Sequence, residues 1–170
     1  MKKALIFLGI AVGIGWVSYF GLSRAFAAEN LRIGFKGIKA RPLSFENGIT
    51  LDITLSISNP TTAPLRLDSI DLVGTYKGNG IGSTVTGSNE FNTTIAPNAT
   101  TDINVVYQIP ISQVTSILGV GYDVILNVIS AGLTFEFSKY FKGVILNFKG
   151  IAKSSNLSVP FDFNADLGTL

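Results

Sequence analysis

The sequence predicts a mainly β protein: an N-terminal transmembrane helix followed by an antiparallel two-sheet β-sandwich of about seven strands with one amphipathic helix. Three observations predict this class. Short segments alternate between apolar and polar residues, which is the period of a half-buried strand. Turn residues recur every 8–12 positions between these segments, as they do in sandwiches. One long apolar run at the N-terminus has the length of a membrane span.

The clearest predicted strand covers residues 49–58. Its odd-numbered residues are isoleucine or leucine, and its even-numbered residues are threonine, aspartate or serine. Successive side chains of a strand point to opposite faces, so a register slip of one residue would exchange the apolar and polar faces. Asn59-Pro60 ends the strand, because proline lacks the N–H that a ladder needs. Pro64 closes a short polar turn, and the return strand begins at Leu65.

Several further segments alternate in the same way. Asn79-Gly80 supplies the two positive-φ residues of a type I′ turn, so residues 76–82 are predicted to form a hairpin. Pro160 interrupts the last segment, and proline is tolerated at a sheet edge, so that strand is placed at an edge. The remaining predicted strands are 31–36, 65–72, 103–109, 133–137, 140–153, with Val144, Leu146 and Phe148 on one face, and 157–163.

The hydrophobic period changes between Ser112 and Gly132. Apolar residues recur there at spacings of three and four, which is the period of a helix buried on one side. The polar side carries neither lysine nor arginine, so we expect the helix to cover one end or face of the sheets rather than lie on a membrane. Gly119 and Gly121 weaken the middle of this single predicted helix by about 1 kcal/mol each.

The composition excludes several kinds of chemistry. The 170 residues include no cysteine and no histidine, which excludes disulfides, thiolate nucleophiles, histidine metal ligands and Ser–His or Cys–His pairs. The net charge of +2 is small and evenly spread, so no nucleic-acid partner is expected. We expect no cofactor and no catalytic, cofactor-binding or metal-binding residues, because the chain carries no phosphate-binding glycine motif and no nucleophile motif.

Two pairs of aspartates come closest to a metal or acid–base site. Asp68 and Asp71 follow a turn, and Asp162 and Asp166 lie in the C-terminal segment. Calcium needs about six to eight oxygen ligands, and no acidic cluster supplies the others, so each pair is expected on a solvated strand. Lysines on the late strands are expected to block edge-to-edge pairing rather than bind nucleic acid. These lysines are Lys139, Lys142, Lys149 and Lys153.

The N-terminal run predicts a membrane anchor in residues 1–24. After a basic start, the nineteen residues 4–22 carry no charge and would span about 28 Å as a helix, close to the bilayer core of about 30 Å. Aromatic residues gather near the far end, where interfacial aromatics are typical. The predicted anchor residues are Ala4, Leu5, Ile6, Phe7, Leu8, Ile10, Val12, Ile14, Trp16, Val17, Tyr19, Phe20 and Leu22.

Two further signals lie in and after the anchor. Gly9 and Gly13 form a G-x-x-x-G spacing that would let two anchors pack closely, although glycine is common in membrane helices generally. Residues 25–30 are a neck of small residues, and 31–170 form the sandwich domain. A cleaved signal peptide is the alternative, because residues 25–27 read Ala-Phe-Ala. The apolar run exceeds the usual signal core of roughly 7–15 residues, which favours an uncleaved anchor.

The order of motifs in residues 31–163 resembles that of a known family. An alternating run ends in Asn59-Pro60, Pro64-Leu65 follows, and a hairpin, a turn, a strand and one helix precede a terminal Val159-Pro160-Phe161. In this order the chain resembles the type-2 late embryogenesis abundant family, also called the water-stress and hypersensitive-response (WHy) domain. The resemblance implies an antiparallel sandwich with one helix and no known catalytic residues. It also implies a link to stress protection, with bacterial and archaeal relatives often exported or anchored.

Three functions fit these features. The first is a non-enzymatic, single-span membrane protein that presents a β-sandwich at a membrane surface for binding or structural support. The second is a structural protein of a virus particle with an internal membrane, or of a similar assembly. The third is a soluble stress-protection protein, exported and released by cleavage after Ala27. We expect a lipid bilayer as partner, with other proteins or self-association through the span. We also expect a cytoplasmic N-terminus with the domain outside.

Overall fold

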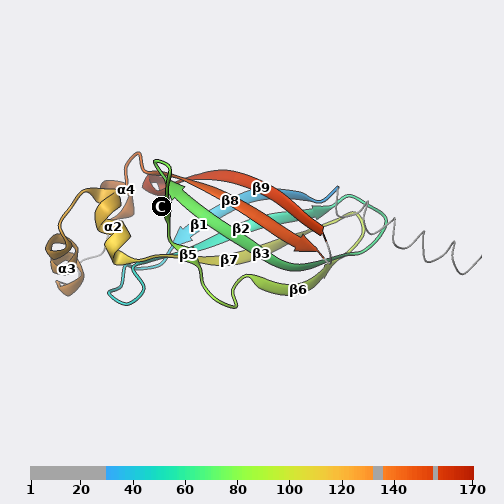
Figure 1. Ribbon diagram of the computed structural model, residues 1–170, viewed down its shortest axis with the longest axis horizontal. Helices are drawn as coiled ribbons and strands as arrows, with labels where there is room; N and C mark the ends of the chain where they lie inside the picture. Colours follow the sequence, from blue (N-terminus) through green and yellow to red (C-terminus); the bar gives the residue numbers. More distant parts are fainter. Residues whose placement is uncertain (1–29, 132–135, 155–156) are drawn as a thin grey trace, which may run out of the picture.

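The computed structural model describes residues 30–131, 136–154 and 157–170. The predicted anchor, most of the neck and the Gly9–Gly13 spacing lie outside the described residues. The described chain is mainly β, with two antiparallel sheets and helices gathered at one end (Figure 1). The predicted class, a mainly β fold of two antiparallel sheets, is therefore confirmed.

The first sheet has the strand order β1-β2-β7-β5. Its strands are β1 (Arg32–Ala40), β2 (Ile49–Asn59), β5 (Ser83–Thr84) and β7 (Ala99–Ile109). The central pair, β2 and β7, runs antiparallel from Ile49 opposite Ile109 to Asn59 opposite Ala99. The isoleucine and leucine residues of β2 are fully buried, and its threonine, serine and aspartate residues are half-buried on the other face. The alternation of residues 49–58 thus produces the two faces that it predicts.

The second sheet has the order β4-β3-β8-β9. The fifth strand, β6, pairs with β3 on the same edge as β4, but with the other end of β3. Its strands are β3 (Leu65–Tyr76), β4 (Asn79–Ile81), β6 (Glu90–Ile95), β8 (Ile145–Ser154) and β9 (Leu157–Asp166). Val144, Leu146 and Phe148 are all buried, which agrees with their predicted position on one face. The strand that contains Pro160 lies at a sheet edge, also as predicted.

The turn from β2 to β3 carries the chain from one sheet to the other, so β3 is not a hairpin partner of β2. The fully buried side chain of Asn59 holds this crossing. Its Nδ2 donates to the carbonyls of Ala63, Ile95 and Ala96 at 2.8, 3.2 and 3.2 Å. Its Oδ1 accepts from the backbone N–H and the hydroxyl of Thr61 at 3.2 and 2.7 Å. One amide therefore joins the β2–β3 turn to the β6–β7 turn.

Tyr107 links the two sheets through the core. Its hydroxyl accepts the backbone N–H of Gly74 at 2.8 Å and donates to the carbonyl of Ile81. Burial raises the pKa of Tyr107, so the phenol stays neutral and can both donate and accept. A Cβ at position 74 would lie 2.9 Å from this hydroxyl, which explains the glycine.

We expect Tyr107→Phe to lower the free energy of unfolding by about 2 kcal/mol, because the N–H of Gly74 and the carbonyl of Ile81 lose their buried partner. Urea unfolding followed by circular dichroism measures the change. The matched control is Tyr122→Phe, at an exposed position, which should change stability by less than about 0.5 kcal/mol. Equal stability of the two variants would contradict the role of the Tyr107 hydroxyl.

The β3–β4 hairpin is present, but its turn is not at Asn79-Gly80. Lys77 and Gly78 hold the positive φ angles, 49° and 83°, and Tyr76 pairs with Asn79. This register places Gly74 opposite Ile81 and buries Ile81 in the core. A turn two residues later would pair Ile81 with a different residue. Burial of Ile81 therefore determines the register of the hairpin, and it outweighs the preference of Asn79-Gly80 for the turn.

The prediction of one helix is wrong. The structure has α2 (Ile111–Leu118) and α3 (Tyr122–Ser130), separated where Gly119 adopts a left-handed φ of 64°. Within the described ranges, no single helix is long and apolar enough to cross a bilayer; α2 and α3 together reach that length and composition, but they are bent by 114°. The break lies at the two glycines that weaken the predicted helix.

The predicted strand over 133–137 falls mostly outside the described residues, and Phe137 is the first residue of the short helix α4 (Phe137–Tyr140). A turn through Gly143, with φ of 75°, then leads into β8. The predicted strand over 140–153 therefore begins later, at Ile145. The chain ends in the 3-10 helix η1 (Leu167–Thr169), next to α4.

The described chain begins at the end of the sandwich opposite the helices (Figure 1). Arg32, the first residue of β1, pairs with Ser58 near the end of β2. Ile49, at the other end of β2, pairs with Ile109, the last residue of β7. The helix α2 starts two residues after Ile109. We call these two ends the N-terminal pole and the helical pole.

A bidentate ion pair on β2 makes stability depend on pH. Nε and Nη2 of Arg41 lie 2.9 and 2.7 Å from the two carboxylate oxygens of Asp52. Hydrogen bonding to Arg41 holds the pKa of Asp52 below its ordinary value of 3.8. A lowered carboxyl pKa contributes stability above 3.8, and this contribution is lost as the pH falls through the lower folded pKa.

We therefore expect acid to destabilise the protein more than it destabilises an Asp52→Asn variant. Urea midpoints at about pH 5 and about pH 2.5 provide the comparison, since asparagine cannot titrate. The other carboxylates titrate in both proteins, so their effects on stability cancel when the two proteins are compared. An equal loss of stability in both proteins on acidification would show that the Arg41 pair contributes nothing.

Candidate binding groove on the second sheet

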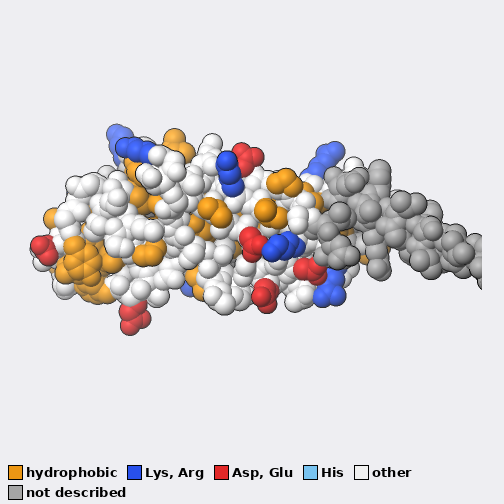
Figure 2. Space-filling model, viewed as in Figure 1, with side chains coloured by type: hydrophobic (Ala, Val, Ile, Leu, Met, Phe, Trp, Pro, Cys, Tyr) orange, Lys and Arg blue, Asp and Glu red, His pale blue; other side chains and the backbone are white. Residues whose placement is uncertain are grey.

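The outer faces of the two sheets differ in chemistry. The outward residues of β2 are threonine, serine and aspartate, so the first sheet presents a polar surface. The second sheet presents Val73, Ile151 and Ile145 to solvent, with 59%, 44% and 54% of their surface exposed. Hydrophobic side chains are visible over this sheet among charged ones (Figure 2). Exposed apolar residues that cluster mark binding surfaces more often than single ones do.

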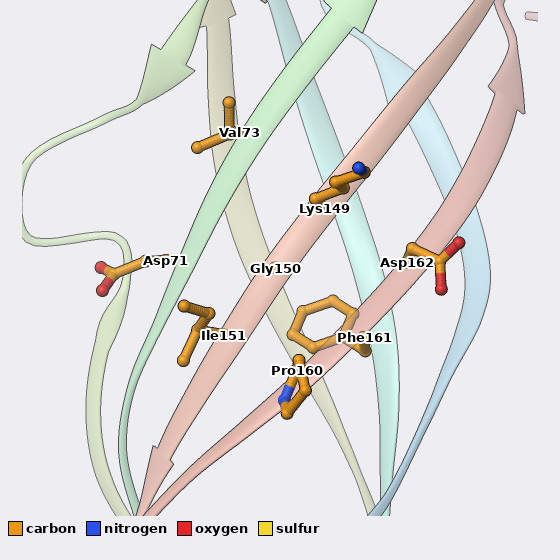
Figure 3. A pocket seen from close by; sticks show the side chains of 8 residues that line it. All are labelled: Asp71, Val73, Lys149, Gly150, Ile151, Pro160, Phe161 and Asp162. Carbon is orange, nitrogen blue, oxygen red and sulfur yellow. The ribbon is translucent and has the colours of Figure 1, made fainter.

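Neighbouring residues on three strands form an open groove of about 590 Å³ on this face. Val73 of β3, Ile151 of β8 and Pro160 of β9 provide its apolar lining (Figure 3). The register places Ile151 directly opposite Pro160, so the two lie side by side across the β8–β9 pair. The groove is therefore fixed by strand pairing rather than by a loop.

Three charged side chains, Asp71, Lys149 and Asp162, line the groove beside its apolar residues (Figure 3), and Lys153 joins them as the ion-pair partner of Asp71. Asp71 and Lys153 form an ion pair with 2.7 Å between Oδ2 and Nζ. Lys149 and Asp162 face each other across β8 and β9, and neither forms an ion pair with another described residue. One ammonium group and one carboxylate thus remain for a ligand at the rim of the groove.

Aromatic rings support the groove from inside the sandwich. Phe161 lies over Gly150, where a Cβ would come within 2.2 Å of the ring. Only glycine at position 150 therefore leaves room for the ring. Phe163 stacks on Phe148 and on Phe35, with ring centroids 5.1 and 4.6 Å apart. The stack reaches from the core to the edge strand β1 and fixes β9 beneath the groove.

The structure separates the aspartates that the sequence pairs. Asp68 is 2.8 Å from the guanidinium of Arg66, and Asp71 pairs with Lys153. Asp166 accepts the N–H of Gly168 at the start of η1, whereas Asp162 lies at the groove. Among the described residues no group of three or more acidic, histidine or cysteine side chains could hold a metal ion.

The lysines of the late strands do not form one basic surface. Lys149 and Lys153 lie on the outer face of β8, where Asp71 neutralises one of them. Lys139 lies over the ring of Tyr140, 5.5 Å from its centroid, and Lys142 precedes the strand. Both are exposed near the helical pole.

Sequence reasoning missed the groove because it treated the charged residues and the apolar residues separately. A usable signal was present: β8 carries Ile145 and Ile151 at outward positions as well as apolar residues at inward ones. Val73 has the same outward position in β3. A strand that is apolar on both faces predicts a contact surface where its outer face is left exposed.

Comparisons with known proteins add little. No protein-family model matches the chain, and no curated protein sequence matches it. A crystal structure of a protein from Archaeoglobus fulgidus is similar with a TM-score of 0.48 at 9% identity, covering 78% of this chain and 94% of that chain. This likeness is distant in both sequence and structure.

Proposed function

We propose that the protein is a non-enzymatic, single-span membrane protein that presents its β-sandwich at a membrane surface. The observation that carries the proposal is that β1 begins at the N-terminal pole, one short neck (residues 25–30) after the predicted anchor. An anchor there would hold the sandwich by one end and leave both sheet faces and the helical pole free. Kinship with the type-2 late embryogenesis abundant family is part of the proposal and rests on the order of Asn59-Pro60, Pro64 and the later motifs.

The groove on the second sheet is the proposed partner surface. Apolar Val73, Ile151 and Pro160 would take up apolar side chains of a polypeptide, and Lys149 and Asp162 would pair with its charges. The outward residues of β2 on the first sheet are, by contrast, threonine, serine and aspartate. Apolar contacts at the centre with charges at the rim are the usual composition of a protein–protein contact surface.

Alkaline carbonate extraction of membranes tests the anchor. We expect the whole chain to stay in the pellet, and a Val12→Lys, Ile14→Lys variant to be released, because each central lysine costs about 2.5–3.5 kcal/mol of insertion energy. A neutral change in the same run, Val12→Leu with Ile14→Leu, is the control and should pellet. Release of the unaltered protein into the supernatant would contradict the proposal.

Photo-crosslinking in cells tests the groove. Benzoylphenylalanine replacing Val73 should give a discrete protein adduct, whereas the same group replacing Thr54 on the first sheet should give none. Both residues point outward, Val73 from β3 and Thr54 from β2, so the pair compares the apolar groove with the polar face of the first sheet. Equal labelling from both positions would refute the groove as a specific partner surface.

A further inference from the structure

The outer face of β8 and β9 carries a pair of opposite charges beside a pair of apolar residues. Lys149 lies opposite Asp162 in the register of the two strands, and Ile151 lies opposite Pro160, two residues further along. All four residues are exposed. Because β9 is the edge strand, the second sheet ends directly beside these pairs. The hairpin therefore presents one positive charge, one negative charge and an apolar pair at a sheet edge.

Such a face is complementary to a second copy of itself. A two-fold axis parallel to the strands, midway between β8 and β9, places β8 of one copy against β9 of the other. Lys149 of each copy then faces Asp162 of the other copy, and Ile151 faces Pro160 in the same way. A two-fold axis repeats every contact, so two ion pairs and two apolar contacts form together. Face-to-face sheets with nearly aligned strands are a common packing, about 10 Å thick.

The other two-fold arrangement of this face is unfavourable. An axis across the strands turns the second copy end over end, so β8 lies against β8 and β9 against β9. With the axis at the charged pair, Lys149 would face Lys149 and Asp162 would face Asp162, and like charges repel. With the axis between the two pairs, both charges would face Ile151 and Pro160 and lose water without gaining a partner. Charge therefore selects the arrangement in which the two copies are parallel.

The parallel arrangement also agrees with the proposed anchor. The strands run between the N-terminal pole and the helical pole (Figure 1), so an axis parallel to them leaves both N-terminal poles at the same end. Two anchors then enter one bilayer side by side. The end-over-end arrangement would direct the two anchors away from each other. One membrane and the charges of the hairpin thus favour the same geometry.

We propose that the partner of the groove is a second copy of this chain, joined face to face through β8 and β9 with the two copies parallel. The inference rests on the proposed function, because it names the partner of the proposed surface and uses the direction of the anchor. Lys149 and Asp162 form the reciprocal ion pairs, and Ile151 and Pro160 exclude water beside them. Val73 of β3 flanks the contact.

The size of the contact makes association depend on the membrane. Each strand has 10 residues, which gives a face about 34 Å long and, for two strands, about 10 Å wide. This is less than the roughly 800 Å² per partner of a stable complex. Anchors that hold both copies in one bilayer raise their effective concentration and compensate for the small area.

The experiment measures energy transfer between donor-labelled and acceptor-labelled full chains in phosphatidylcholine vesicles. The chain has no cysteine, so Ser116→Cys, at an exposed position of α2, provides a single labelling site. Two charge reversals, Lys149→Glu and Asp162→Lys, are made separately in this labelled chain. Each variant alone places like charges in both reciprocal contacts, so we expect its association constant to fall at least tenfold.

Mixing the two variants is the sharpest test. In a mixed pair both reciprocal contacts again join opposite charges, so energy transfer should return to nearly the level of the unaltered protein. A partner other than a second copy would give no such recovery. The matched control pair, Lys142→Glu and Glu136→Lys, reverses exposed charges near α4 and should leave energy transfer unchanged, separately and mixed. Circular dichroism confirms that every variant is folded.

Each contrary result overturns the inference. Absence of energy transfer between unaltered copies, or a loss in both variants without recovery on mixing, contradicts a second copy as the partner. Energy transfer that neither reversal lowers assigns the association to the span instead of the groove. Carbonate extraction of the same vesicles reports the anchor separately. An extracted chain contradicts the proposed function and with it the dimer in one membrane, whereas a retained chain without energy transfer contradicts this inference alone.

Discussion

Replacing Asn59 by alanine is expected to lower the free energy of unfolding by about 3–5 kcal/mol. The change removes the donor of the buried Ile95 carbonyl and of the part-buried Ala63 and Ala96 carbonyls, and the acceptor of the Thr61 N–H. The Thr61 hydroxyl loses one of its two acceptors and keeps the carbonyl of Ala63. Each unsatisfied buried group costs about 1–3 kcal/mol, although the turns can relax and admit water. Urea unfolding measures the loss. Asn127→Ala, an exposed asparagine on α3, is the control and should change stability by less than about 0.5 kcal/mol.

Asn59→Asp distinguishes hydrogen bonding from packing, because aspartate has nearly the same shape. At neutral pH a carboxylate would face the carbonyls of Ala63, Ile95 and Ala96 and could donate to none of them. Protonation restores one donor, so the gap in stability between variant and unaltered protein should narrow as the pH falls. A gap that is small at neutral pH, or independent of pH, would contradict the role given to Asn59.

Replacing Gly48 by alanine should cost about 3 kcal/mol or more. A Cβ there would lie 2.1 Å from the carbonyl oxygen of Ile109 and 2.8 Å from the backbone nitrogen of Ile111, and backbone atoms cannot move aside cheaply. Gly48 also has a φ of 62°, which disfavours any residue with a Cβ. The loop before β2 and the β7–α2 junction therefore meet at a point where only glycine fits.

Gly78→Ala provides the matched control for Gly48. Gly78 has a φ of 83°, but no atom lies within 4 Å of the Cβ that alanine would add. Gly78→Ala should therefore lower the free energy of unfolding only by the cost of a positive φ in alanine, about 1–2 kcal/mol. Equal losses of thermal stability in the two variants would show that close approach at Gly48 contributes nothing beyond φ.

The strands were predictable because burial on one face imposes the period of two. Residues 49–58 show this directly, since each apolar residue is fully buried and the register with β7 has no break. The β2–β3 crossing was not predictable in the same way, because alternation records which face is buried and not which sheet a strand joins. Asn59 decides that crossing through contacts with Ile95 and Ala96, which are distant in sequence.

Errors in the helix and the hairpin have a common cause. In both places local propensity competes with tertiary burial. Gly119 ends α2 where a periodic pattern predicts continuation, and Ile81 fixes the hairpin register against the Asn79-Gly80 signal. The free-energy cost of a glycine in a helix can be estimated from the sequence. Whether packing outweighs that cost depends on which residues are neighbours in the fold, and the sequence does not show this directly.

The candidate groove was predictable only in part. Lys149, Lys153, Asp71 and Asp162 were all noticed as charged residues of the late strands or of aspartate pairs. Their assembly depends on the pairing of β3 with β8 and of β8 with β9, which brings distant segments into register. The apolar centre of the groove comes from outward residues that a search for conventional chemistry ignores.

The central claim is that residues 1–24 are retained and hold the sandwich at a membrane. The most direct measurement is the intact mass of the native protein recovered from the carbonate-resistant membrane fraction. We expect a mass of 18.1 kDa, that of residues 1–170. A soluble protein whose mass shows a start at Ala28 or Glu29 would contradict it.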